Sequence, residues 1–141
     1  MKELDDFMKN WVEDTLGVRP IFEQLRKHLV GQADLALEFN ARPGISYSLR
    51  ARHKNQKQYP LFVLIDIIDD EPEERWLSVC FFAESLAEEQ RQKGDIVPGG
   101  LMGQNACCFD VAEGDEDLPR DEGDLLVACL DSARDFAVAN L

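Results

Sequence analysis

The sequence predicts an α+β domain in which one largely antiparallel sheet of about five strands is covered on one face by helices. Three observations support this prediction: two helical patterns begin the chain, several short strand patterns follow, and a last helical pattern closes it. Consecutive strands of this kind are usually neighbours in one sheet. With 141 residues, of which 45% are hydrophobic and 30% charged, the chain is expected to form a single domain over residues 1–141.

Residues 1–31 predict an N-terminal pair of helices. Apolar side chains recur at spacings of three and four residues, as on one face of a helix, at Leu4, Phe7, Met8, Trp11, Val12 and Leu16. Gly17 is predicted to end this first helix. Pro20 suits the first turn of a second helix, which Gly31 is predicted to end.

The next part of the chain predicts two hairpins. Residues 35–39 and 45–52 alternate apolar and polar side chains on either side of a proline-glycine turn. Residues 61–68 and 76–82 are rich in β-branched and aromatic residues, and the acidic segment 69–74 separates them as a charged tip. Residues 105–111 supply a fifth strand.

The remaining segments predict two helices and a loop. Residues 83–93 predict a short helix or helical turn, whereas residues 94–104, with four glycines and one proline, predict an irregular crossing loop. Residues 118–140 predict a C-terminal helix that Asp117 can cap and whose apolar stripe must cover a sheet. The four cysteines lie in such apolar patterns and are interpreted as reduced core residues: Cys80, Cys107, Cys108 and Cys129.

The charge of the chain limits its partners. A net charge of −13 disfavours binding to nucleic acid and to anionic membranes. The N-terminus does not follow the signal-peptide pattern, and no apolar run approaches the ~20 residues that a membrane span requires. We therefore expect a cytoplasmic protein that does not enter a membrane.

One hairpin is basic although the chain is acidic. Residues 39–65 contain five lysines and arginines and no acidic residue. Within this hairpin four side chains share one strand face and could bind an anion: Ser46, Ser48, Arg50 and Arg52. Two alternatives remain open. The charges could form an ordinary solvated strand face, or the acidic tip could lie across the sheet and neutralise them.

Asp66 interrupts an otherwise apolar strand, and a carboxylate in such surroundings could serve as a general acid or base. Alternatively, it lies on the less covered face of the sheet or pairs with Arg50 or Arg52. No second catalytic group accompanies it, so the sequence predicts no catalytic residue.

Other site patterns are missing. Cys107 and Cys108 should point to opposite faces of a strand, and neither CxxC spacing nor a histidine-cysteine cluster is present, so no metal site is predicted. The glycine-rich segment 94–104 lacks the lysine and serine or threonine of a phosphate-binding loop. No cofactor is therefore predicted.

Two segments carry a resemblance to a known family. The chain resembles the uncharacterised YdhG/YjbR-like domains, whose fold is grouped with frataxin, in Arg42-Pro43-Gly44-Ile45-Ser46-Tyr47-Ser48-Leu49 and in Cys108-Phe109-Asp110 followed by Asp117-Leu118-Pro119. The resemblance implies a small cytoplasmic domain with a sheet and terminal helices, and no settled activity. The strand motifs of frataxin itself are not matched, so an iron-handling role is not implied.

Three functional hypotheses follow from these patterns. The first is a non-enzymatic binding or interaction module that contacts a protein or a small anionic ligand around Arg50 and Arg52. The second is a small-molecule sensor or enzyme with a pocket between the sheet and the loop of residues 94–104, where Asp66 or an arginine supplies the polar group. The third is a homodimer formed through the helix that contains Trp11 or through an exposed strand.

Overall fold

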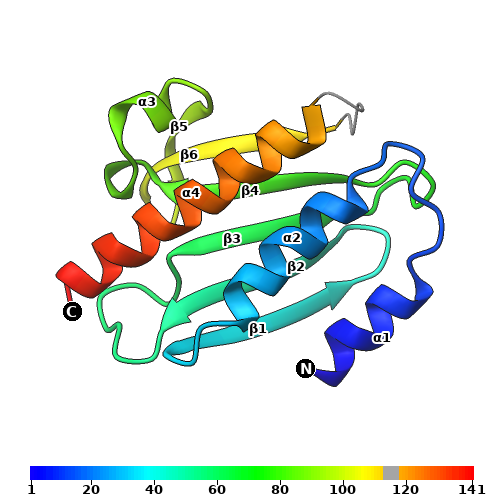
Figure 1. Cartoon of the computed structure of the whole chain (residues 1–141), viewed down its shortest axis with the longest axis horizontal. Helices are drawn as coiled ribbons and strands as arrows, with labels where there is room; N and C mark the ends of the chain where they lie inside the picture. The colour runs from blue at the N-terminus through cyan, green and yellow to red at the C-terminus, as the bar shows by residue number, and fades with distance from the viewer. Residues whose placement is uncertain (113–117) are drawn as a thin grey trace.

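The computed structural model describes residues 1–112 and 118–141 as one antiparallel sheet of six strands with helices at both ends of the chain (Figure 1). The predicted α+β class is confirmed, with six strands where the sequence indicated about five. Asp117, the predicted helix cap, lies outside the described residues. The elements follow in the order α1 (Lys2–Asn10), α2 (Arg19–Val30), β1 (Leu35–Arg42), β2 (Ser46–His53), β3 (Val63–Ile68), β4 (Trp76–Phe82), η1 (Ala83–Ser85), α3 (Glu88–Arg91), β5 (Asp95–Leu101), β6 (Gln104–Val111) and α4 (Leu118–Ala139).

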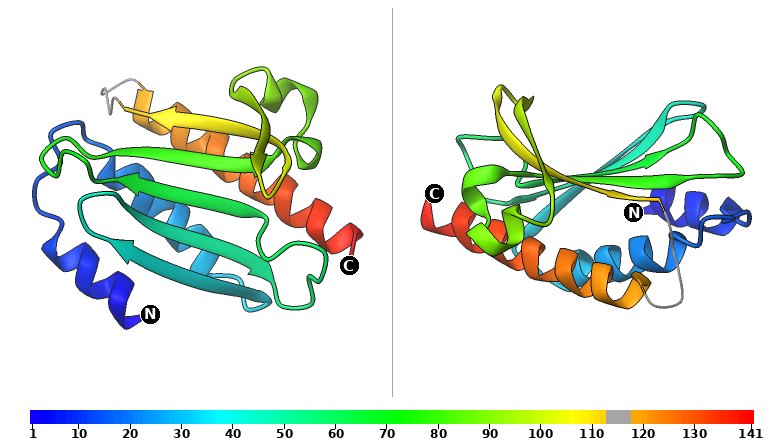
Figure 2. Two further views of the ribbon diagram at one scale, coloured as in Figure 1. Left: turned by 180° about the vertical axis from the view of Figure 1, so that it is seen from behind. Right: turned by 90° about the horizontal axis from the view of Figure 1, so that it is seen from above.

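The molecule has two layers, a sheet and a layer of helices. The strand order is β1-β2-β3-β4-β6-β5, and every neighbouring pair is antiparallel. Helices α2 and α4 lie side by side across one face, as Figure 2 shows from above. The main core fills the space between them and the sheet, and includes Phe22, Ile65, Phe81 and Leu130.

Apart from an ion pair between Arg26 and Asp5 of α1, helix α2 packs mainly against α4. Two polar contacts connect these helices, one from Gln24 to Asp124 at 3.0 Å and one between His28 and Asp131 at 2.7 Å. Both predicted N-terminal helices are present. However, α1 lies beside the part of the sheet that β1 and β2 form. There the ring of Phe7 contacts the ring of Tyr47, with the two centroids 4.2 Å apart.

Helix α1 ends at Asn10, earlier than its apolar pattern predicted. Trp11 has left the helical conformation, and its carbonyl oxygen accepts a hydrogen bond from the guanidinium of Arg19. The carboxylate of Asp14 accepts hydrogen bonds from the backbone N–H groups of Val18 and Arg19, both at 2.9 Å, which are free donors at the start of α2. This capped turn places Val12 in solvent, where 81% of it is exposed.

The predicted irregular loop at residues 94–104 is instead mostly the edge strand β5. Asp95, Ile96 and Val97 pair with β6, and the register shifts between Val97 and Leu101. An edge strand needs hydrogen bonds on one side only, so it accommodates Pro98, which has no backbone N–H to donate. Glycine and proline content predicts irregular backbone correctly in many loops, but here it marks a bulged edge strand.

Candidate functional site

The side of the sheet opposite α2 and α4 carries all five residues that the sequence predicts as ligand-binding candidates, which are Ser46, Ser48, Arg50, Arg52 and Asp66. Strand alternation and pairing register define this surface, which we call the helix-free face (Figure 2). It comprises Ala36, Glu38, Asn40 and Arg42 of β1, Ser46, Ser48, Arg50 and Arg52 of β2, Leu64, Asp66 and Ile68 of β3, Trp76, Ser78, Cys80 and Phe82 of β4, and Ala106, Cys108 and Asp110 of β6.

The two serines that β2 contributes to this face, Ser46 and Ser48, each form a hydrogen bond with a neighbouring side chain. Both are buried, and the hydroxyl of Ser48 donates a hydrogen bond to Asp66 in the next strand. The hydroxyl of Ser46 accepts one from the guanidinium of Arg42 at 3.1 Å. These serines therefore hold strands together, and the arginines are the groups that remain available to an anion.

Arg50 and Arg52 differ in how they are held. One guanidinium nitrogen of Arg52 donates to the backbone carbonyl of Lys54 at 3.2 Å, which directs this side chain along the end of β2. The buried Nε of Arg50 has no hydrogen-bond partner among the described residues. Glu38 is directly across from Arg50 in register, yet no ion pair joins these two residues in the described structure.

A shallow hollow lies beside the two arginines. Its volume is about 230 Å³, and it is lined by Ala36, Leu37, Glu38, Arg50, Ala51, Arg52 and Pro60. The hollow therefore combines two guanidinium groups with one carboxylate at its β1 side. Such a set can accept a carboxylate or phosphate group through charge-assisted hydrogen bonds.

The acidic tip does not neutralise these arginines through direct pairing. It connects β3 to β4 at the end of the sheet beside Ser46, whereas Arg50 and Arg52 lie toward the other end of β2. Asp69 bonds instead to Arg75, with 2.7 Å between Nε and Oδ1. Asp70 and the three glutamates of the tip are exposed, and among the described residues none of them forms an ion pair with β2.

Asp66 lies in a row of polar side chains that crosses five strands. In register this row contains Asn40, Ser48, Asp66, Ser78 and Asp110. Asp66 is half-buried and accepts its hydrogen bond from Ser48 rather than from Arg50 or Arg52. The row contains no histidine, lysine or cysteine, and the hydrogen bond from the Ser48 hydroxyl to the Asp66 carboxylate joins β2 to β3.

Two further hollows lie near residues 94–104 and the C-terminal helix. One of about 230 Å³ is lined by Ala83, Glu84, Gly103, Gln104 and Asn105, and Asp66 is not among its lining residues. The other, bounded by the segment after β2, by η1 and by α4, has a volume of about 30 Å³. That volume suits a water molecule rather than a substrate.

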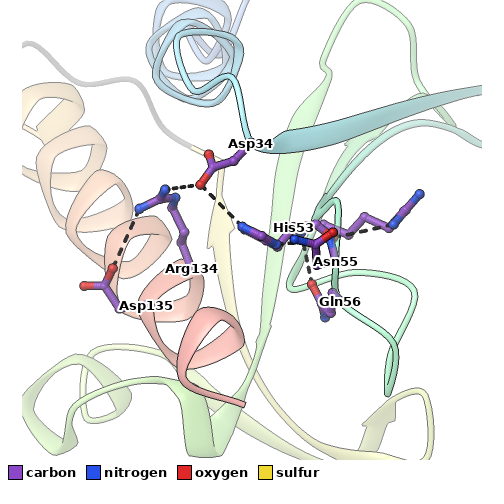
Figure 3. A network of polar contacts seen from close by, with 7 residues as sticks. Asp34, His53, Asn55, Gln56, Arg134 and Asp135 are labelled. Carbon is purple, nitrogen blue, oxygen red and sulfur yellow. Dashed lines mark hydrogen bonds and ion pairs between the residues drawn. The ribbon is translucent and has the colours of Figure 1, made fainter. Parts of the chain in front are cut away.

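Sequence reasoning missed a polar network that joins three distant segments. Asp34, which precedes β1, bonds to Arg134 of α4 and lies 3.4 Å from Nε2 of His53 at the end of β2 (Figure 3). Nδ1 of His53 accepts a hydrogen bond from the backbone N–H of Asn55 at 3.1 Å, so the proton of the neutral ring lies on Nε2, toward Asp34. The network fixes α4 and the segment after β2 to the start of the sheet.

The Asp34 network predicts a pH-dependent contribution to stability. Loss of hydration raises the pKa of Asp34, but the hydrogen bond from Arg134 and the charges of Arg134 and His53 outweigh it, so the pKa lies below the ordinary value of 3.8. A carboxyl whose pKa is lowered by folding stabilises the folded state above its unfolded pKa, and this contribution disappears as the pH falls through the folded pKa. Asp34→Asn is therefore expected to lower the Tm at pH 7, and the difference from the unmodified protein should shrink below about pH 3.8.

Thermal unfolding at pH 7 and at pH 3 measures this difference. Asp135→Asn is the matched control, because its side chain is exposed and lies 3.9 Å from the same arginine. If Asp34→Asn lowered the Tm by the same amount at both pH values, the result would contradict a pH-dependent stabilisation by Asp34.

The cysteines are divided between the two sides of the sheet. Cys107 and Cys129 are buried in the main core, as predicted, whereas Cys80 and Cys108 are half-buried on the helix-free face. The prediction that Cys107 and Cys108 point to opposite faces is confirmed. All four thiols are free, and no group of three or more potential metal ligands forms within the described ranges.

The fold and the site define the class of this protein. It is an α+β protein with one antiparallel sheet and helices on one face of that sheet. The helix-free face carries two neighbouring arginines, Arg50 and Arg52. Comparison of the chain with protein-family models, with curated proteins and with solved structures finds no match. None of the described helices has the length and apolar character needed to cross a bilayer.

Proposed function

We propose that this protein is a non-enzymatic binding module that receives an anionic group in the hollow beside Arg50 and Arg52. The observation that carries this proposal is a pair of guanidinium groups that form no ion pair with any described residue of a chain whose net charge is −13. Several other cations, among them Arg42 and Arg91, also form no ion pair with a described residue, but Arg50 and Arg52 share one strand face and line one hollow. Two that stay unpaired beside a hollow favour recognition of an external anion.

The size of the hollow limits what it can receive. Pockets for drug-sized ligands and cofactors usually measure about 300–1,000 Å³. At about 230 Å³ and open to solvent, the hollow suits one carboxylate or phosphate group better than a whole nucleotide. This supports either an acidic side chain of a partner protein or a small anion as the ligand.

The first test is a titration of the intact protein followed by backbone amide chemical shifts in NMR. Three probes separate the possible sources of the anion: inorganic phosphate, citrate and a hexaglutamate peptide. We expect shifts that saturate and are centred on β1 and β2. A response to the peptide alone would identify a protein partner, whereas a response to citrate or phosphate would identify a small ligand. No localised response to any of the three at low ionic strength would contradict the proposal.

Charge reversal makes the test specific. Arg50→Glu/Arg52→Glu is expected to weaken binding of the responding probe at least about tenfold, because one charged hydrogen bond contributes ~1.5–3 kcal/mol. Lys2→Glu/Lys9→Glu is the matched control, since it changes the net charge equally on exposed positions of α1. Equal weakening by both variants would show a general charge effect and not a site.

Two alternatives have less support. For a sensor or enzyme site at residues 94–104, the hollow at the β5–β6 turn offers one carboxylate, that of Glu84, and amide groups. For a homodimer, Trp11 is fully buried within its own chain, so the exposed edge strand β5 is the better candidate contact. Light scattering of the purified protein tests the dimer directly.

A further inference from the structure

Two cysteines face each other on the helix-free face. Cys80 of β4 and Cys108 of β6 are direct partners in the antiparallel register. Residues paired in this way have Cα atoms about 4.5 or 5.5 Å apart, depending on the type of pair. Both separations lie within the range of about 4.4–6.8 Å that disulfides span. The backbone therefore already holds the two residues at a distance that a disulfide can bridge.

The register also excludes the neighbouring Cys107 from pairing with Cys80. Cys107 follows the opposite alternation and is buried in the main core together with Cys129 of α4. Cys80 and Cys108 are each half-buried, on the face that no long helix covers. A small oxidant can thus reach this pair more easily than the two core thiols.

The two thiols are chemically unequal. A hydrogen bond from Cys108 lowers the pKa of Cys80, and the same contact raises the pKa of Cys108. Ser78 adds to this effect, since its hydroxyl oxygen lies 3.7 Å from the sulfur of Cys80. Cys80 is therefore the first nucleophile, because the thiolate is the reactive form.

We propose that Cys80 and Cys108 form a reversible disulfide across β4 and β6, with a small-molecule disulfide as the oxidant. The thiolate of Cys80 attacks one sulfur of the oxidant and releases the first small thiol, leaving a mixed disulfide. The sulfur of Cys108, after losing its proton, then attacks the sulfur of Cys80 and releases the second small thiol. The two cysteines are oxidised, and one small disulfide is reduced to two thiols.

This modification does not depend on the proposed anion site. The bond would join two interior strands of the sheet, in the same cross-strand row as Leu64 and Arg50. It would limit how far β6, and the β5 edge paired to it, can separate from β4. The reduced protein is expected to be less stable than the oxidised one, because the cross-link restricts the unfolded chain.

The test uses the full chain and oxidised glutathione as the probe. After incubation, the protein is denatured, alkylated with N-ethylmaleimide and digested for peptide mass spectrometry. The reduced chain should carry four alkylated cysteines, as its composition requires. The oxidised chain should carry two, with one peptide pair that links Cys80 to Cys108 and separates on addition of dithiothreitol. Four alkylated cysteines after oxidation, or a link that involves Cys107 or Cys129, would overturn the proposal.

Single substitutions test the pairing and the order of attack. Cys108→Ser should trap glutathione on Cys80, whereas Cys80→Ser should leave Cys108 largely unmodified. Cys129→Ala is the control, since its core position predicts an unchanged link. Trapping on Cys108 but not on Cys80 would overturn the proposed mechanism, and peptide mapping of the unsubstituted protein keeps the test independent of any folding defect.

Discussion

Replacing Asp69 with alanine is expected to lower the free energy of unfolding by about 3–5 kcal/mol, the usual cost of leaving one partner of a buried ion pair alone. Asp69 is only 3% exposed. Its carboxylate accepts hydrogen bonds from Nε of Arg75 at 2.7 Å and from the backbone N–H of Gly44 at 2.8 Å. The substitution leaves both donors without this partner. The guanidinium of Arg75 is held over the rings of aromatic residues, which cannot replace a carboxylate.

Urea unfolding followed by tryptophan fluorescence measures the effect. Asp70→Ala is the matched control, because Asp70 is exposed and bonds only to the next backbone N–H in the described contacts. Asp70→Ala should change the free energy of unfolding by no more than about 0.5 kcal/mol. The double variant Asp69→Ala/Arg75→Met removes the unpaired charge and is expected to be more stable than Asp69→Ala alone. A single Asp69→Ala variant within about 1 kcal/mol of the unmodified protein would contradict a buried, energetically coupled pair.

The alternation of side chains in β2 could be predicted from the sequence, because the period of a strand is two. It correctly placed Ser46, Ser48, Arg50 and Arg52 on one face. What alternation alone did not supply is the register against β3, which pairs Ser48 with Asp66 and so assigns that carboxylate to a hydroxyl and not to an arginine. Register depends on the geometry of the connections between strands and on the whole buried face.

Contacts between distant segments were beyond sequence reasoning. The acidic tip was identified as a run of charges, but nothing in its pattern distinguishes Asp69, which is buried against Arg75, from Asp70, which is exposed. Asp34, His53 and Arg134 likewise lie in three separate segments and meet only because α4 crosses the sheet near the end of β2. The Cys80–Cys108 pair has the same origin, since β5 is placed at the edge and leaves β6 beside β4.

Trp11 and Val12 were expected to share the apolar stripe of one helix, and the structure predicts opposite energetic roles for them. Trp11 is fully buried, packs near Phe22, and donates its indole N–H to the carbonyl oxygen of Glu13 at 2.9 Å. Trp11→Ala is therefore expected to lower the free energy of unfolding by about 3–5 kcal/mol, because it removes a large core side chain and leaves a cavity.

Val12→Ala is the matched control for Trp11→Ala at the neighbouring position. Val12 is 81% exposed, so its truncation should change the free energy of unfolding by no more than about 0.5 kcal/mol. Urea unfolding monitored by circular dichroism compares the two without relying on the indole that one variant lacks. A continuous helix through Gly17 would instead bury part of Val12, and the two substitutions would then both be destabilising. The difference between them thus tests where α1 ends, which is the point at which the Asp14 cap overrides the apolar pattern.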